Sequence, residues 1–187
     1  QLNSLTFSNL AYITHLASIP TVTSAQLPAH TIASVSSEHE IKLYEYIEGI
    51  GQLTYLHTLK GHKNTIHDIQ YAGTHTSYTR PDYKPVDNVL LCSASEDGTC
   101  AIWDIRTPNI ASICKSPQKR SLFSCTMYEQ TVVTGGRNGI VCVWDIRSSN
   151  KPVQSTEDLH TDDVTQLSFH PYNRNTVVSG SEDGLLC

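Results

Sequence analysis

Short runs of alternating apolar and polar residues, separated by tight polar turns, recur along this 187-residue chain. In three places the alternation flanks an Asp-Gly or Asn-Gly pair, at 97–98, 138–139 and 183–184. Such a pair between alternating runs is the strongest short-range signal for a β-hairpin. A fourth segment, 30–46, has the same layout with Glu38-His39 in the turn, where the turn chemistry is weaker. The pattern therefore predicts an all-β fold assembled from hairpins.

The hairpins belong to an internal repeat. Each copy has an apolar run, a stretch of small or hydroxyl residues, a polar turn and a second alternating run. Most turns follow one another at intervals of about 40–45 residues, and a longer first interval indicates an insertion. The four copies lie at 30–46, 89–105, 130–146 and 175–187.

A further apolar run precedes the second, third and fourth copies. The segments 61–71 and 159–171 alternate apolar and polar residues behind an early histidine, His62 or His160. The matching segment of the third copy, 121–129, has no histidine. We expect each of these runs to add a strand to its hairpin.

The second and third copies end in the same four residues, Trp-Asp-Ile-Arg, at 103–106 and 144–147. With Gly-His at 61–62, this repeat resembles the WD40 family, whose repeats are four-stranded blades of a β-propeller. The stretch 159–185 is also similar to the WD repeat-containing protein 89 group.

The resemblance implies a WD40 β-propeller portion with about four blades. The fourth copy stops before its aromatic position, so we expect a truncated last blade and half of a seven-bladed ring. The expected blades span about 1–50, 51–108, 109–150 and, in part, 151–187.

In WD40 blades a histidine, a strand serine or threonine, the turn aspartate and the tryptophan form a buried hydrogen-bonded chain. We interpret the His-Ser-Asp set here as structural, because it recurs in several copies without a nucleophile elbow. In the first blade the matching positions hold Ser34, Glu38 and Tyr44. The other blades match at His62, Ser93, Asp97 and Trp103, at Thr134, Asn138 and Trp144, and at His160, Ser179 and Asp183.

Each Trp-Asp pair is followed by an arginine two positions after the aspartate, Arg106 or Arg147. Trp-Asp-x-Arg resembles the box by which many WD40 proteins dock onto the adaptor of cullin-4 ubiquitin ligases. The planar guanidinium fork suits a partner carboxylate. The alternative is that these arginines only pair with Asp104 and Asp145.

Two loops are further candidates for binding or regulation. The insertion 72–88 is predicted to emerge on the same face as the two arginines, and its Tyr78, Arg80 and Tyr83 are residue types that anchor interfaces. It is alternatively a tolerated loop without a role. The basic segment 115–120 contains Ser116-Pro117, either a proline-directed phosphorylation site or a plain turn between blades.

Composition excludes several other functions. The 13 basic and 18 acidic residues give a net charge of −5 without charge blocks, which argues against nucleic acid or a membrane as partner. The six cysteines form no Cys-x-x-Cys pair and the nine histidines are scattered, so we expect no metal site and no cofactor. With no apolar run of membrane-spanning length, we expect an intracellular protein, cytoplasmic or nuclear.

The sequence predicts a non-enzymatic scaffold that binds other proteins, as yet unidentified. The alternative within the binding class is a substrate receptor of a cullin-4 type ubiquitin ligase, acting through Arg106 and Arg147. A propeller enzyme is a remote third hypothesis, which a deep pocket with perturbed carboxylates would favour.

Overall fold

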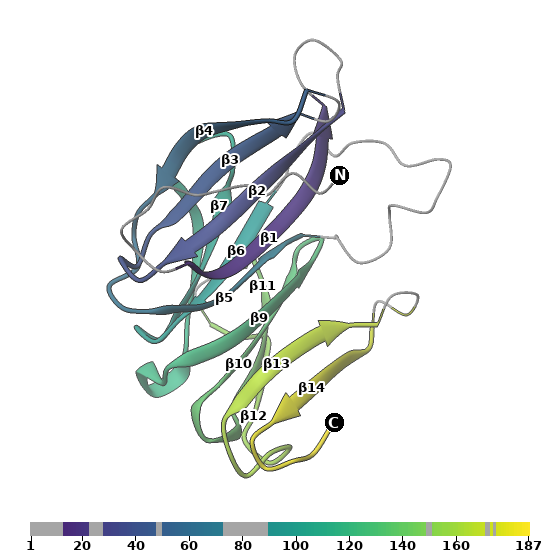
Figure 1. Ribbon diagram of the computed structural model, residues 1–187. Helices are drawn as coiled ribbons and strands as arrows, with labels where there is room; N and C mark the ends of the chain where they lie inside the picture. Colours follow the sequence, from purple (N-terminus) through teal and green to yellow (C-terminus); the bar gives the residue numbers. More distant parts are fainter. Residues whose placement is uncertain are drawn as a thin grey trace.

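The computed structural model describes residues 13–22, 28–47, 50–72, 90–148, 151–170, 173 and 175–187. These residues form three four-stranded sheets and one two-stranded sheet, all antiparallel between neighbouring strands. The all-β propeller architecture predicted from the sequence is thereby confirmed. Figure 1 shows the sheets following one another in chain order, with β1, β5, β9 and β13 each next to the one before.

Each sheet is a meander in which strands adjacent in sequence pair with each other. The first sheet contains β1 (Ile13–Val22), β2 (Pro28–Ser36), β3 (Ile41–Ile47) and β4 (Gln52–Leu59). The second contains β5 (Ile66–Tyr71), β6 (Leu90–Ser95), β7 (Thr99–Asp104) and β8 (Ile110–Lys115). The third contains β9 (Leu122–Tyr128), β10 (Thr131–Gly136), β11 (Val141–Asp145) and β12 (Gln154–Thr156). The fourth contains β13 (Val164–Phe169) and β14 (Val177–Ser181).

The sheets do not follow the blade limits inferred from the sequence. β4 was expected at the start of the second blade but pairs with β3, and β8 was expected in the third blade but pairs with β7. Likewise, β12 pairs with β11 and completes the third sheet. These outer strands carry neither the turn nor the Trp-Asp pair, so the sequence contains no local signal that assigns them to a sheet.

The turns that join the paired strands need a left-handed backbone. Gly98, Gly139 and Gly184 have φ of +79°, +73° and +81°, a region that glycine enters without steric cost. Asn138, just before Gly139, also has a positive φ of 57°, which asparagine tolerates better than most residues.

Successive sheets pack face to face through the strands nearest the centre. β5 contacts β1 on one side and β9 on the other, and β9 contacts β13. The seam between the first two sheets buries Leu43, Tyr71 and Trp103. The next two seams bury Trp144 among cysteines and aliphatic residues, and then Leu167 among valines and Phe169.

Within the described part of the chain, no helix is long and apolar enough to cross a membrane. The helical segments described are two single turns, at Pro117–Lys119 and Arg137–Gly139, which join strands.

Candidate functional site

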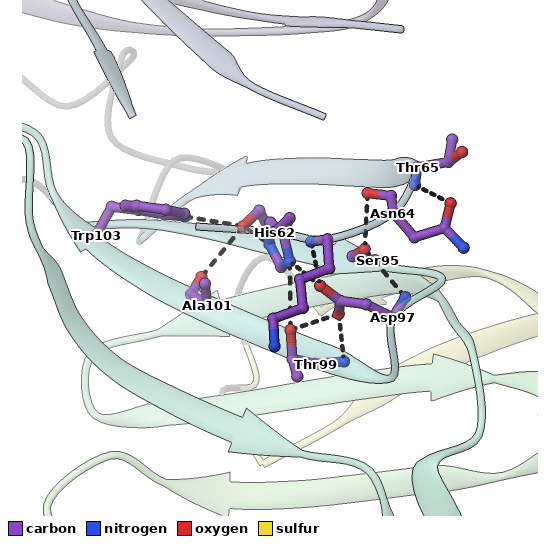
Figure 2. A network of polar contacts seen from close by, with 10 residues as sticks. His62, Asn64, Thr65, Ser95, Asp97, Thr99, Ala101 and Trp103 are labelled. Carbon is purple, nitrogen blue, oxygen red and sulfur yellow. Dashed lines mark hydrogen bonds and ion pairs between the residues drawn. The ribbon is translucent and has the colours of Figure 1, made fainter. Parts of the chain in front are cut away.

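The second sheet contains a closed hydrogen-bond network (Figure 2). His62 Nε2 lies 2.8 Å from Ser93 Oγ, and its Nδ1 lies 3.1 Å from Asp97 Oδ2. Trp103 Nε1 donates to the same Ser93 oxygen at 2.8 Å. Thr99 donates its hydroxyl and its backbone N–H to Asp97 Oδ1 at 2.6 and 2.9 Å. The imidazole thus connects the tight turn to the buried tryptophan.

The turn carboxylate is held in its charged form. Burial opposes ionisation of Asp97, but hydrogen bonds from His62, Thr99 and the backbone of Lys63 outweigh it and lower its pKa well below the usual value. Since the network satisfies each of these buried polar groups, it stabilises the blade rather than activating a nucleophile. Ser93 is fully buried and accepts the indole N–H, so no substrate reaches its hydroxyl.

We expect Asp97→Ala to lower the free energy of unfolding by about 1–3 kcal/mol, because it leaves His62 and a backbone N–H without an acceptor. The folded pKa lies below the unfolded value of about 4, so the stabilisation is complete above that pH and is lost progressively as the pH falls from there through the folded pKa. Urea unfolding at neutral and acid pH checks both points. Equal midpoints for wild type and variant at neutral pH would contradict the role of Asp97.

The fourth sheet repeats the network with residues from the segment before β13, from β14 and from the turn after β14. His160 Nε2 lies 2.8 Å from Ser179 Oγ, and Nδ1 lies 3.1 Å from Asp183 Oδ2. Thr161 donates its backbone N–H to the same carboxylate oxygen at 2.9 Å, as Lys63 does in the second sheet. The two histidines therefore occupy equivalent positions.

The third and first sheets contain only parts of this arrangement. Trp144 Nε1 donates to Thr134 Oγ1 at 3.0 Å. Asn138 is not brought into that pair: it is exposed, and its backbone N–H donates to Asp163 Oδ1 of the following segment at 2.8 Å. In the first sheet Ser34 is buried, Glu38 donates its backbone N–H to Ser36, and Tyr44 packs edge-to-face on Tyr55 with ring centroids 5.8 Å apart.

The arginines of the Trp-Asp-Ile-Arg segments lie just past the ends of β7 and β11. Arg106 donates from Nε and Nη2 to the two oxygens of Asp104, at 2.9 and 2.6 Å. Arg147 makes the same two-point contact with Asp145, at 3.0 and 2.7 Å. Hydrogen bonding from Arg147 lowers the pKa of Asp145 to about 2. Both guanidinium groups are therefore fixed in direction by a neighbouring carboxylate.

The two fixed arginines share one face of the molecule and remain exposed. Their side chains are 56% and 71% accessible. Asp104 pairs with Leu90 and Asp145 with Thr131, so both arginines lie where the central strands β5 and β9 end. The insertion 72–88 leaves the sheet between Tyr71 and Leu90, at this same end. Its candidate residues, Tyr78, Arg80 and Tyr83, lie outside the described residues.

Ser116 lies in the segment between β8 of the second sheet and β9 of the third. Its side chain is 5% exposed, and its backbone N–H donates to Gly98 O at 2.9 Å. A kinase cannot reach this hydroxyl in the folded chain, so the geometry favours the plain turn over a phosphorylation site.

Asp68 is a contact between blades that the sequence analysis did not identify. From β5 it accepts hydrogen bonds from Ser124 Oγ at 2.8 Å and from the backbone of Cys125 at 3.0 Å, both on β9. Ser124 Oγ in turn accepts the backbone N–H of Leu167 on β13 at 3.0 Å. Burial raises the pKa of Asp68 against these hydrogen bonds. Two side chains thus link three successive sheets.

Among the residues that the structure describes, one group of three side chains could hold a metal ion: Asp162, Asp163 and Glu182, with ligand atoms within 4.8 Å. Asp163 already accepts the backbone N–H of Asn138. Exposed acidic groups of this kind are common without an ion, so we assign no metal site. The five cysteines in the described strands are buried, and burial raises the pKa of Cys114 and that of Cys142 above the usual thiol value. Such thiols are unreactive.

The chain is similar to several known proteins. The model of the family "WD domain, G-beta repeat" matches residues 53–104 and 151–187. WD repeat-containing protein GTS1 of Arabidopsis thaliana is 33% identical over 83% of this chain and 37% of its own length. A WD repeat-containing protein 89 homolog of Dictyostelium discoideum is 29% identical over 83% of this chain and 38% of its own length.

The chain therefore spans little more than a third of the length of these relatives. Among solved structures, the computationally designed Ika8 protein superposes on 93% of this chain and 44% of its own, with a TM-score of 0.63 and 26% identity. The chain has repeated four-stranded sheets and hydrogen-bonded Trp-Asp units. Together with these matches, they show that the chain belongs to the WD40-repeat family.

Proposed function

We propose that the protein is a non-enzymatic scaffold that binds other proteins through the face on which Arg106 and Arg147 lie. The observation that carries the proposal is the geometry of these two arginines: equivalent positions in adjacent sheets, each exposed and each fixed by a two-point contact with its aspartate. A guanidinium group held in one direction loses little conformational entropy when it meets a partner.

The same two residues support a second candidate function, docking onto the adaptor of a cullin-4 ubiquitin ligase as a substrate receptor. It depends on the Trp-Asp-x-Arg resemblance, together with the exposure of both arginines at one end of the sheets. In this version the adaptor is the partner that both arginines contact.

Affinity purification of the full-length protein from cells tests both functions. We expect the double variant Arg106→Ala/Arg147→Ala to lose partners that the wild type retains, because each guanidinium group supplies charge-assisted hydrogen bonds. Lys151→Ala is the control, since it removes an exposed positive charge near the same end of β11. Comparing the captured proteins by quantitative mass spectrometry gives the result.

Loss of the cullin-4 adaptor from the double variant alone would support the receptor function. Loss of other partners without the adaptor would support the general scaffold and exclude the receptor. An identical set of partners for wild type, double variant and control would contradict binding through this face.

A further inference from the structure

A cluster of basic residues occupies the opposite end of the second and third sheets. Lys63 donates its backbone N–H to Asp97 in the β6–β7 turn at 2.9 Å. In the same turn Gly98 packs so closely that an added Cβ would lie 3.1 Å from the carbonyl group of Lys119. Arg137 donates its backbone N–H to Ser121 O at 3.0 Å, two residues after Lys119. Three separate segments therefore bring Lys63, Lys119 and Arg137 to the same seam, the one between the second and third sheets.

The positive charges of these three residues are not neutralised by the described part of the chain. All three side chains are exposed, and none lies within 4.0 Å of a described carboxylate. By contrast, Arg120 in the same loop pairs with Glu157 at 3.2 Å. The β6–β7 turn carries two carboxylates: Asp97 is already engaged by His62 and Thr99, and the charge of Glu96 acts on His67. A chain with a net charge of −5 thus has a local surplus of cations here.

Two aromatic rings lie beside the cluster. Both occur where strand pairing is irregular: His67 between Ile66 and Asp68 of β5, and Phe123 of β9 opposite the Gly135–Gly136 step. Such bulges redirect side chains. The rings meet edge-to-face with centroids 5.0 Å apart, and the Arg137 guanidinium carbon lies 5.8 Å from the Phe123 centroid.

His67 adds an unpaired polar atom to this arrangement. Its Nε2 is inaccessible to solvent and has no hydrogen-bond partner. Burial lowers the pKa of His67, so the ring is neutral at physiological pH and does not repel the guanidinium group of Arg137. The seam therefore contains the exposed side chain of Arg137, whose guanidinium group lies near the aromatic pair of Phe123 and His67.

We propose that this basic seam, made of Lys63, His67, Lys119, Phe123 and Arg137, binds a short acidic segment of a partner protein. The inference rests on the proposed scaffold function but places a second contact on the other face. A carboxylate pairs with the Arg137 fork, the two lysines attract neighbouring acidic residues, and an aromatic side chain of the segment packs on Phe123.

The surrounding charges favour a short acidic peptide over a nucleic acid. At the same end of the structure, the segment before β13 and the turn after β14 are acidic, with Glu157, Asp158, Asp162, Asp163 and Glu182. A long polyanion that extends beyond the seam meets this repulsive surface. A peptide with a few acidic residues fits within the basic seam alone.

Fluorescence anisotropy with the full-length protein tests the proposal. The probe is a short fluorescein-labelled peptide of glutamate and tyrosine, and its control is the isosteric glutamine–tyrosine peptide. We expect the glutamate peptide to bind, and the variant Lys63→Gln/Lys119→Gln/Arg137→Gln to weaken that binding about tenfold or more. Arg137→Lys retains the charge but loses the planar fork, so it should weaken binding by a smaller factor.

Lys151→Gln, on the opposite face, should bind the probe as the wild type does. Equal binding of the two peptides, or of the triple variant and the wild type, would overturn the proposal. Tighter binding of a fluorescein-labelled uridine homopolymer than of the glutamate peptide would overturn it in favour of a nucleic acid. None of these results depends on Arg106 or Arg147, so they are distinct from a failure of the scaffold function.

Discussion

Replacing Gly139 with alanine is expected to lower the free energy of unfolding by about 3 kcal/mol or more. Two independent costs add at this position. The backbone has φ of +73°, which alanine adopts only with strain. An added Cβ would also lie 2.1 Å from the carbonyl oxygen of His160, far inside van der Waals contact. That oxygen is backbone, so the seam between the third and fourth sheets must open to relieve the clash.

Gly184→Ala is the matched control. Gly184 occupies the equivalent turn of the fourth sheet with φ of +81°, and an added Cβ there meets nothing within 4 Å. It should therefore cost only the backbone strain, about 1–2 kcal/mol. Urea unfolding of both variants measures the difference. If the two variants lose equal free energy of unfolding, the close approach of Gly139 to His160 contributes nothing to the cost of Gly139→Ala.

The two glycines also show what could be predicted from sequence. The Asn-Gly and Asp-Gly pairs predicted the turns, because a tight hairpin needs residues that tolerate a positive φ. That requirement is local, so a single chain segment reveals it. The contact of Gly139 with His160 is between two sheets, and no residue spacing along the chain predicts it.

The same distinction separates the candidate site residues. His62, Ser93 and Asp97 were expected together from the WD40 resemblance, and the structure brings them within hydrogen-bonding distance. Asp68 was not identified, because an aspartate in an alternating strand resembles any solvent-facing polar residue. Its partner Ser124 lies on another sheet and far along the chain.

The arginines were only partly predictable. Arg106 follows Asp104 by two residues, and the sequence left open whether the pair is closed on itself or available to a partner. The structure contains the two-point pair and also leaves the guanidinium group more than half exposed. The pairing with the aspartate is therefore observed, whereas contact of the exposed guanidinium group with a partner stays a prediction.

Replacing Trp103 with alanine is expected to cost about 3–5 kcal/mol of unfolding free energy. The indole is fully buried between the first and second sheets and packs edge-to-face near His62, with centroids 6.1 Å apart. Its removal leaves a cavity against Gly61, where little space separates the backbone from the ring. It also takes away the N–H that Ser93 accepts.

A double-mutant cycle separates the hydrogen bond from the packing. Trp103→Phe retains most of the ring but removes the donor, and Ser93→Ala removes the acceptor. Because Ser93 also contacts His62, we expect the two changes to be non-additive by about 1 kcal/mol or more in urea unfolding. Additive losses would mean that the bond has no stabilising role beyond ring burial.

The third sheet provides the comparison for this cycle. Trp144 donates to Thr134 in the same way, yet no histidine joins that pair among the described residues. Thr134→Val with Trp144→Phe should therefore couple more weakly than the pair in the second sheet, since no imidazole is left unpaired. Equal coupling in the two sheets would show that His62 and Asp97 do not strengthen the tryptophan bond. A weaker coupling in the third sheet would assign the added stability to the histidine and the turn carboxylate.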